Sequence, residues 1–258
     1  MVAAQRATGM RKVHVGSMGW SYDFWKGNFY PKNLASNRFL TYYSRQFDTV
    51  EVNSTFYRIP SKKTLLDWRE QTPNDFIFSL KFPKIITHVK MLRNCEEETQ
   101  VFLEHVEFLE EKLGPLLLQF PPTFRDDRMP LLREFLERLP KHHRYVVEVR
   151  NKTLLTDSLY DILGDNSVAL AWVESPFMPL VSELTSDFIY VRWEGDRKKI
   201  NGTFGKIEVD RSGEIALWAD KLKPFRVRKM VVFGYFSKCY SGFPPSDIST
   251  FFKSSMIS

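Results

Sequence analysis

Short apolar runs alternate with longer amphipathic stretches along the whole chain. The short runs are rich in β-branched and aromatic residues, which is typical of buried strands. Eight of them occur: VHVGS from Val13, TVEVN from Thr49, FIFSLKF from Phe76, PLLLQF from Pro115, YVVEVR from Tyr145, VALAWVE from Val168, FIYVRWE from Phe188 and KMVVFGYF from Lys229. The intervening stretches have helical spacing, for example Asn37 to Gln46, Lys62 to Gln71, Glu96 to Lys112 and Pro130 to Leu139. Ser61 is suited to cap the second of these helices, and Pro130 to begin the last.

This alternation predicts repeated βα units around a parallel sheet. A chain of 258 residues with eight strands matches a single (β/α)8 TIM barrel, a fold of about 250 residues. A doubly wound open sheet is the alternative. Only a short segment containing Pro176 and Pro179 separates the sixth and seventh strands, so helix six is expected to be short or missing. No Pro-rich, Gly-rich or Ser-rich linker divides the chain, which predicts one barrel over residues 13–258 after a flexible tail over residues 1–12.

Polar residues gather at the C-terminal ends of six predicted strands. In strand order they are Glu51 and Asn53, Ser79 and Lys81, Gln119, Glu148 and Arg150, Glu174, and Arg192 and Glu194. Residues two apart share one face of a strand, and a strand buried on both faces should be almost wholly apolar. Active sites of barrel enzymes are built at this end of the strands. The sequence therefore predicts a polar site at the C-terminal mouth of the barrel, or buried ion pairs that close it.

The charges in this set suggest a chemistry. A buried unpaired charge costs several kcal/mol, so Lys81, Arg150 and Arg192 are expected to face the glutamates or a bound anion. Such a cluster is suited to proton transfer and to binding a carboxylate or phosphate. A desolvated Lys81 could also act as a base or a Schiff-base amine.

Aromatic residues follow the first two predicted strands. The segment GWSYDFWKGNFYP contains Trp20 and Tyr22, and NSTFYRIP contains Phe56 and Tyr57. Both segments would border the barrel mouth, where aromatic rings could stack on bases or sugars. The alternative is a hydrophobic plug that packs onto the rim.

Composition narrows the possible partners and location. The 37 Lys and Arg residues exceed the 31 Asp and Glu residues, giving a net charge of +6, which is compatible with phosphate esters or nucleic acid. No apolar run is long enough to span a membrane, and the N-terminus lacks the apolar stretch of a secretory signal. Together with only two cysteines, these features predict a cytoplasmic protein without a membrane anchor.

No metal or cofactor is expected from the motifs. The histidines have no metal-binding spacing, and only His88 falls in a loop near the predicted mouth. A magnesium site formed by Glu148 and Glu174 is an alternative, although neighbouring cations would compete for the carboxylate oxygens. The sequence also lacks a GxSxG elbow, a GxGxxG motif and a Walker loop.

Five ordered motifs carry a family resemblance over nearly the whole chain from Val13. GSMGWSYDFWKGNFYP, DTVEVNSTFYRIPS, FSLKFPKIITH, GPLLLQFPP and VVEVRN resemble the YecE-like family of uncharacterised proteins. The resemblance implies a TIM barrel, and DNA binding has been suggested for the family by analogy with barrel endonucleases. Positions matching the family pattern are Glu51, Asn53, Lys81, Gln119, Glu148 and Arg150. The sequence departs from that pattern at Glu174, where Asp is usual, at Glu194, where His is usual, and at Ser237, Lys238 and Cys239, where the family has Asn-Asn-His.

These observations lead to three functional hypotheses. The first is a metal-independent enzyme for an anionic, phosphorylated or sugar-containing ligand. In it Lys81 and Glu148 transfer protons with Glu174 as a further catalytic group, and Arg150 and Arg192 hold the anion. The remaining predicted ligand contacts are Trp20, Tyr22, Glu51, Asn53, Tyr57, Gln119 and Glu194. The second is a DNA- or RNA-binding or nucleolytic barrel. The third is a non-catalytic binding protein whose site the strand-eight changes have altered.

Overall fold

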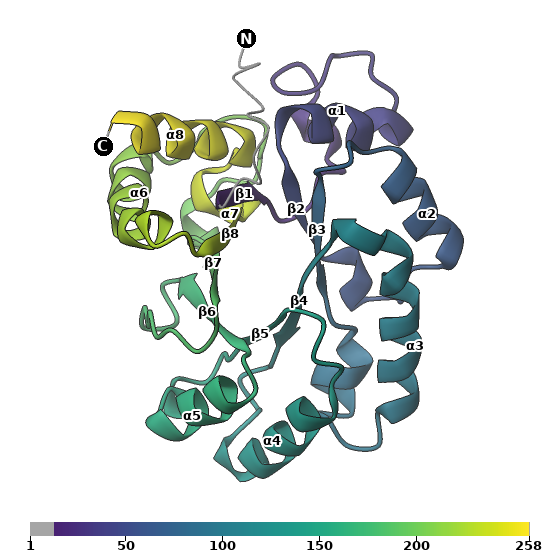
Figure 1. The fold of residues 1–258 in the computed structure, drawn as a ribbon. Helices are drawn as coiled ribbons and strands as arrows, with labels where there is room; N and C mark the ends of the chain where they lie inside the picture. Colours follow the sequence, from purple (N-terminus) through teal and green to yellow (C-terminus); the bar gives the residue numbers. More distant parts are fainter. Residues whose placement is uncertain (1–12, 258) are drawn as a thin grey trace.

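Eight parallel strands curl into a nearly closed barrel with helices on its outer face (Figure 1). The structure is a computed structural model and describes residues 13–257. The strands are β1 (Val13–Ser17), β2 (Thr49–Val52), β3 (Ile77–Lys81), β4 (Leu113–Gln119), β5 (Tyr145–Glu148), β6 (Ala169–Glu174), β7 (Phe188–Trp193) and β8 (Val231–Phe236). They pair in the order β1-β8-β7-β6-β5-β4-β3-β2. The predicted TIM barrel is thus confirmed, whereas the predicted tail over residues 1–12 lies outside the described residues.

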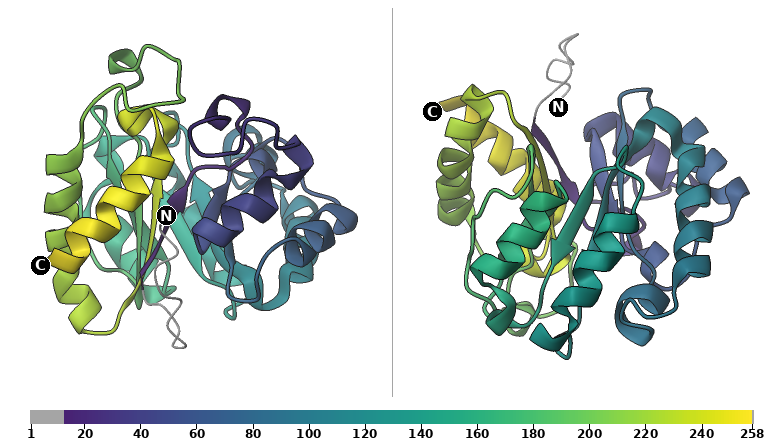
Figure 2. Two further views of the ribbon diagram at one scale, coloured as in Figure 1. Left: turned by 90° about the horizontal axis from the view of Figure 1, so that it is seen from above. Right: turned by 60° about the horizontal axis from the view of Figure 1, so that its bottom comes forward.

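Seven helices and one short helical turn surround these strands in the described chain (Figure 2). They are α1 (Phe39–Gln46), α2 (Lys62–Glu70), α3 (Glu96–Val106), α4 (Met129–Arg138), α5 (Asp157–Asp165), α6 (Ser212–Val227), α8 (Pro244–Ile257) and the turn α7 (Lys238–Ser241). Ser61 caps α2 by accepting a hydrogen bond from the Thr64 amide, and Pro130 lies in the first turn of α4, as predicted. Over residues 13–257, no helix combines the length and apolar character needed to cross a membrane.

The helix predicted from Glu96 to Lys112 divides into two parts. α3 ends at Val106, and a 3-10 segment, η5 (Glu107–Lys112), continues to β4. Glu110 has a φ of 51° and a ψ of −129°, which an α-helix cannot contain. Glu107 therefore lies where α3 ends and η5 begins, on the way to the N-terminal end of β4.

An extended segment takes the place of the helix that would connect β6 to β7, as the prolines predicted. It covers β6 through two polar anchors: the Trp172 indole donates a hydrogen bond to the Glu183 carbonyl over 2.9 Å, and Thr185 bonds the backbone of Val168 and Leu170. Through these bonds the segment gives partners to the Trp172 indole and to backbone groups of Val168 and Leu170, which are buried in the fold.

The barrel closes between β1 and β2 by a side chain rather than a full strand ladder. A single parallel bridge joins Met18 to Glu51. Below it, the Tyr43 hydroxyl accepts a hydrogen bond from the Ser17 amide at 2.9 Å and donates to the Thr49 carbonyl at 3.1 Å. The backbones approach so closely that a Cβ on Gly16 would lie 2.2 Å from the Thr49 oxygen. A glycine in β1 is therefore required for this closure.

The barrel interior is layered from apolar to charged. Its middle holds buried residues of alternating strand positions, among them Leu117, Val146, Ala171, Tyr190 and Phe233. On β4, β5 and β7 the next inward positions towards the C-terminal strand ends are the buried polar residues Gln119, Glu148 and Arg192. This change of character, two residues apart on the same strands, places the charged cluster at the mouth.

Candidate functional site

Arg192 is the centre of a buried ion-pair network. Its Nε and Nη2 donate to the two oxygens of Glu51 at 2.8 and 2.9 Å. Its Nη1 donates to Glu148 and Glu194, both at 2.5 Å, and Nη2 also contacts the Met18 sulfur at 3.4 Å. These five contacts use all five guanidinium N–H groups. Each Arg192 donor thus already has an acceptor, and the role of Arg192 in holding a substrate anion stays a prediction.

Glu148 is fixed by three donors, one each from β4, the end of its own strand β5, and β7. Besides Arg192, its Oε1 accepts from Gln119 at 2.8 Å and from Arg150 at 2.7 Å. Burial by itself would raise the pKa of this carboxyl, but the positive charges of Arg192, Arg150 and Lys81 outweigh it and lower the pKa to about 2. Glu148 is therefore ionised at neutral pH and is poorly suited to the proton-transfer role expected from the sequence.

The acids and bases of this network balance. Glu51 also accepts from the Tyr190 hydroxyl at 2.8 Å and from the Asn53 amide at 2.9 Å, while Arg150 also donates to Glu194 at 2.8 Å. Three bases thus lie among three acids, namely Lys81, Arg150 and Arg192 among Glu51, Glu148 and Glu194. The structure brings together eight of the predicted site residues when Asn53 and Gln119 are included.

Lys81 is the member of the cluster that is not held by a carboxylate. Its Nζ donates to the Gln119 oxygen at 2.6 Å and lies 4.0 Å from the centre of the Phe56 ring. Burial, together with the nearby charge of Arg192, lowers the pKa of Lys81 from 10.5 to about 8. A substantial fraction of this amine is therefore neutral slightly above neutral pH, as a base or nucleophile requires.

His88 also lies at the site, although its residue type and spacing predicted no role for it. It lies in the π-helical turn η4 (Ile85–Val89) after β3, with its ring 4.8 Å from that of Phe56. Burial and the positive charges of Lys81 and Arg150 lower the pKa of His88 to about 4. The imidazole is thus neutral at pH 7 and lies near two cations. Its position in the loop after β3 was the signal available in the sequence.

The predicted aromatic contacts divide into different environments. Trp20 packs edge-on against Trp68 of α2 and Phe78, at 5.4 and 6.4 Å, so it lies over the outside of β3, which corrects its predicted ligand contact. Tyr22 is half-buried and donates to the Met18 carbonyl at 2.6 Å. Tyr57 is 73% exposed and is free to cover a ligand.

Glu174 lies outside the charged cluster. It follows Trp172, which faces the surrounding helices, so strand alternation turns both side chains outward. Its Oε2 accepts from the Trp218 indole at 2.5 Å and from the Tyr240 hydroxyl at 3.2 Å. The predicted participation of Glu174 is therefore corrected, as is the alternative magnesium site, because Glu148 and Glu174 lie on opposite faces.

The strand-eight segment borders the mouth. The Ser237 hydroxyl accepts from the Cys239 amide at 3.1 Å and begins α7. Lys238 Nζ lies 4.8 Å from the Phe204 ring and 5.6 Å from the Tyr22 ring. Burial raises the pKa of the Cys239 thiol, which disfavours a reactive thiolate.

Fold and cluster together define a (β/α)8 barrel with a charge-compensated site at the C-terminal strand ends. Comparison with known proteins places it within this class: the family described as "Protein of unknown function DUF72" matches residues 14–256. The chain belongs to this family, which confirms the resemblance found in the motifs.

Relatives and solved structures agree with this assignment. The chain is 37% identical over 139 residues to the UPF0759 protein YecE of Escherichia coli K12, covering 54% of this chain and 48% of that protein. It is 26% identical over 172 residues to the UPF0759 protein YunF of Bacillus subtilis, covering 63% of this chain and 59% of that protein. The alignments thus span roughly half of these relatives.

A DUF72 family structure from Thermotoga maritima superimposes with a TM-score of 0.81 and 26% identity, covering 96% of this chain and all of the other. A DUF72 structure from Enterococcus faecalis gives 0.74 at 20% identity, covering 95% and 96%.

Proposed function

We propose that the protein is an enzyme that binds an anionic small molecule at the barrel mouth and uses Lys81 to transfer a proton. The observation that carries this proposal is the state of Lys81. The residue is 8% exposed, and among the described residues its amine is bonded to the neutral Gln119 rather than to an acid. A buried cation without a directly bonded carboxylate is costly, and a bound anion would supply that partner.

Arg150 supports the anionic character of the ligand. Its side chain is one-third exposed, and it donates through Nε and Nη2 to Glu148 and Glu194. Within residues 13–257, no hydrogen bond from its Nη1 is present. Besides burial and the charge of Arg192, the charge of Arg150 contributes to lowering the pKa of Lys81, and an anion between Lys81 and Arg150 would offset their repulsion. A carboxylate or phosphate accepts such donors through charge-assisted bonds.

Proton transfer follows from the pKa of Lys81. In its neutral form, Nζ would accept a proton from a C–H or O–H group of the ligand, so that this bond breaks and an N–H bond forms. The resulting ammonium would be held by the Gln119 oxygen and the Phe56 ring. Asn53, Tyr22 and Tyr57 would contact the remainder of a phosphorylated or sugar-containing ligand. The buried glutamates and Arg192 would keep Gln119 and Arg150 in place.

Binding of two simple probes tests the site. Inorganic phosphate and acetate would be titrated into the full chain by calorimetry, with Lys81→Met and Arg150→Met compared with the wild type. We expect each variant to lose at least about tenfold in affinity for the preferred probe, since each removes a charge-assisted bond. Lys84→Ala, at an exposed lysine beside the Tyr57 ring, is the matched control. Unchanged affinity in Lys81→Met would refute the proposal.

Nucleic-acid binding is the second candidate function. One observation favours it: the exposed η8 turn (Arg197–Lys199) and the exposed Lys84 follow β7 and β3, at the same end of the barrel as the mouth. Fluorescence anisotropy with single-stranded and duplex DNA would reveal an affinity that falls steeply from low to moderate salt. A triple alanine variant of Arg197–Lys199 should abolish it. Absence of nucleic-acid binding at low salt would exclude this function.

For the small-molecule site, ligand binding without turnover would favour a non-catalytic binding protein over an enzyme.

A further inference from the structure

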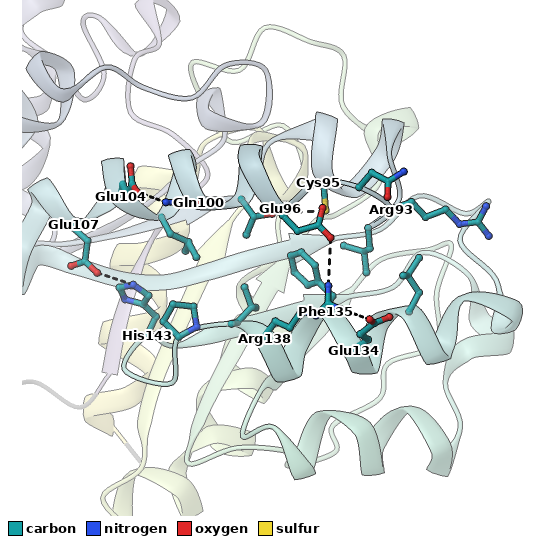
Figure 3. A pocket seen from close by; sticks show the side chains of 17 residues that line it. Arg93, Cys95, Glu96, Gln100, Glu104, Glu107, Glu134, Phe135, Arg138 and His143 are labelled. Atoms are coloured by element: carbon teal, nitrogen blue, oxygen red, sulfur yellow. Dashed lines mark hydrogen bonds and ion pairs between the residues drawn. The ribbon is translucent and has the colours of Figure 1, made fainter.

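A second polar cluster lies at the N-terminal end of the barrel, away from the mouth. It contains Glu107, at the start of η5, and the adjacent His142 and His143, in the turn before β5. One potential ligand atom from each residue lies within 4.8 Å of the others. Figure 3 shows Glu107 and His143 facing each other at one end of the cavity between α3 and α4.

The distances in this cluster are close to those of a metal site. His142 Nε2 and His143 Nε2 each lie 3.0 Å from the same Glu107 oxygen. Tetrahedral zinc with bonds of about 2.0–2.1 Å separates its ligand atoms by roughly 3.3 Å. A displacement of a few tenths of an ångström at Glu107 would therefore open room for the ion. The Glu107 side chain is 51% exposed, so its rotamer can adjust.

Buried polar atoms without partners provide an independent observation. The His143 side chain is only 6% exposed, and its Nε2 makes no well-aligned hydrogen bond despite its proximity to Glu107. The neighbouring Tyr145 hydroxyl is also buried without a hydrogen-bond partner, and its ring lies 6.0 Å from that of His143. Such atoms are costly unless an ion or water satisfies them.

The cavities beside the cluster give a metal ion access to it. Glu107 and His143 line the cavity of about 690 Å³ between α3 and α4, and also a second cavity of about 340 Å³ bordered by His142 and Arg144. A hydrated ion can therefore reach them.

We propose that Glu107, His142 and His143 form a zinc-binding site. Two imidazole nitrogens and one carboxylate favour Zn²⁺ over Mg²⁺ or Ca²⁺, which prefer oxygen ligands. A water molecule would complete the tetrahedron and bring a hydrogen-bonding group close to the buried Tyr145. The ion would join the end of α3 to the turn before β5, at the barrel end where residues serve stability rather than catalysis.

Zinc binding would be measured on the tag-free full chain after treatment with a chelator. Calorimetry at pH 7.5 should show one Zn²⁺ per chain, and added Zn²⁺ should raise the melting temperature. Co²⁺ should give the visible absorption of a tetrahedral site. Glu107→Gln and His142→Ala alter exposed side chains and are expected to fold, yet each should weaken Zn²⁺ binding by more than about tenfold, since even outer-shell changes cost 10–100-fold.

Two controls distinguish this site from non-specific binding. Glu104→Gln changes an exposed acid of α3 that bonds Gln100 and should bind Zn²⁺ as the wild type does. Lys81→Met should also retain it, which separates the zinc site from the mouth. Failure of the wild type to bind Zn²⁺, or wild-type affinity in both Glu107→Gln and His142→Ala, would overturn the proposal. His142 would then be only an ion-pair partner of Glu107.

Discussion

Arg192 shows how one buried side chain can organise the entire mouth. Its guanidinium satisfies Glu51 through two parallel bonds and bridges to Glu148 and Glu194. A buried ion pair gives little net stability compared with apolar residues, but removing one partner leaves the others uncompensated. Arg192 therefore matters for stability mainly because its loss would leave buried carboxylates without a cation.

Replacing this arginine should destabilise the fold strongly. Arg192→Met leaves Glu51 and Glu148 buried without their main cation, and we expect a loss of about 3–5 kcal/mol in the free energy of unfolding. Urea denaturation would measure it. Arg133→Ala, which breaks an exposed pair with Asp165, should change stability by less than about 1 kcal/mol. Similar losses in both variants would show that the network is not the cause.

The lowered pKa of Lys81 has a measurable consequence for stability. Between pH 8 and 10.5 the folded state binds fewer protons than the unfolded state, so the free energy of unfolding contributed by Lys81 rises with pH in this window. The cost of burying the ammonium is fully present below pH 8. A shift from 10.5 to about 8 corresponds to about 3 kcal/mol.

Comparison with Lys81→Met isolates this contribution. Chemical denaturation at intervals from pH 7 to 10.5 would give the difference in unfolding free energy between variant and wild type. The unfolding free energy of the wild type should rise relative to that of the variant as pH increases. Lys84→Met, at an exposed lysine, should show no such trend. A flat difference for Lys81→Met would mean that Lys81 titrates normally.

At the scale of elements, the closure between β1 and β2 depends on a helix. Tyr43 of α1 inserts its hydroxyl between the Ser17 amide and the Thr49 carbonyl. The two strands share only the bridge between Met18 and Glu51, so this hydroxyl takes the place of missing ladder bonds.

Removing that hydroxyl should loosen the closure. Tyr43→Phe leaves a buried amide and a buried carbonyl without this partner, and we expect a loss of about 1–3 kcal/mol in unfolding free energy. Amide hydrogen exchange should also accelerate in β1. Tyr42→Phe changes the adjacent half-buried tyrosine, for which no hydroxyl hydrogen bond is present in the described chain, and should be nearly neutral. Equal effects of the two changes would contradict this account.

At the scale of the whole molecule, charge is divided between a balanced interior and a basic exterior. The mouth pairs three acids with three bases, whereas the chain carries a net charge of +6. The surplus therefore lies outside the cluster. Acid should unfold the protein partly by protonating Glu148, whose pKa is held at about 2.

Protonation of Glu148 should make the free energy of unfolding fall at acid pH. Because the folded pKa of Glu148 lies below its usual 4.5, its contribution is present above pH 4.5 and is lost as pH falls towards 2. Glu148→Gln should be less stable than the wild type at pH 7, with the difference shrinking at low pH. Thermal melts from pH 7 to 2.5 would test it, with Glu134→Gln as an exposed control. A difference that does not change with pH would argue against a charged Glu148.

Hydrophobic periodicity was sufficient to predict the barrel, the absent helix and most of the mouth. Alternation within a strand is a local property, so Glu51, Lys81, Gln119, Glu148 and Arg192 could be placed on inward faces from sequence alone. The same rule separates Glu174 from the cluster, because it follows Trp172 by two positions and shares its outward face. Glu174 was predicted to belong to the mouth because it lies at a strand end, without regard to which face of the strand it occupies.

Tertiary structure alone decided which charges are already satisfied. Arg192 donates to Glu51 and Glu148 of other strands and to the nearby Glu194, while the ammonium of Lys81 meets an amide and an aromatic ring. It also decided that Trp20 faces α2 and that Glu107 meets two histidines about 35 residues away. The sequence determines the side-chain types and the face each occupies, because these follow from local backbone geometry. Partners, burial and hence pKa depend on distances between strands and helices remote in the chain, which only the folded barrel fixes.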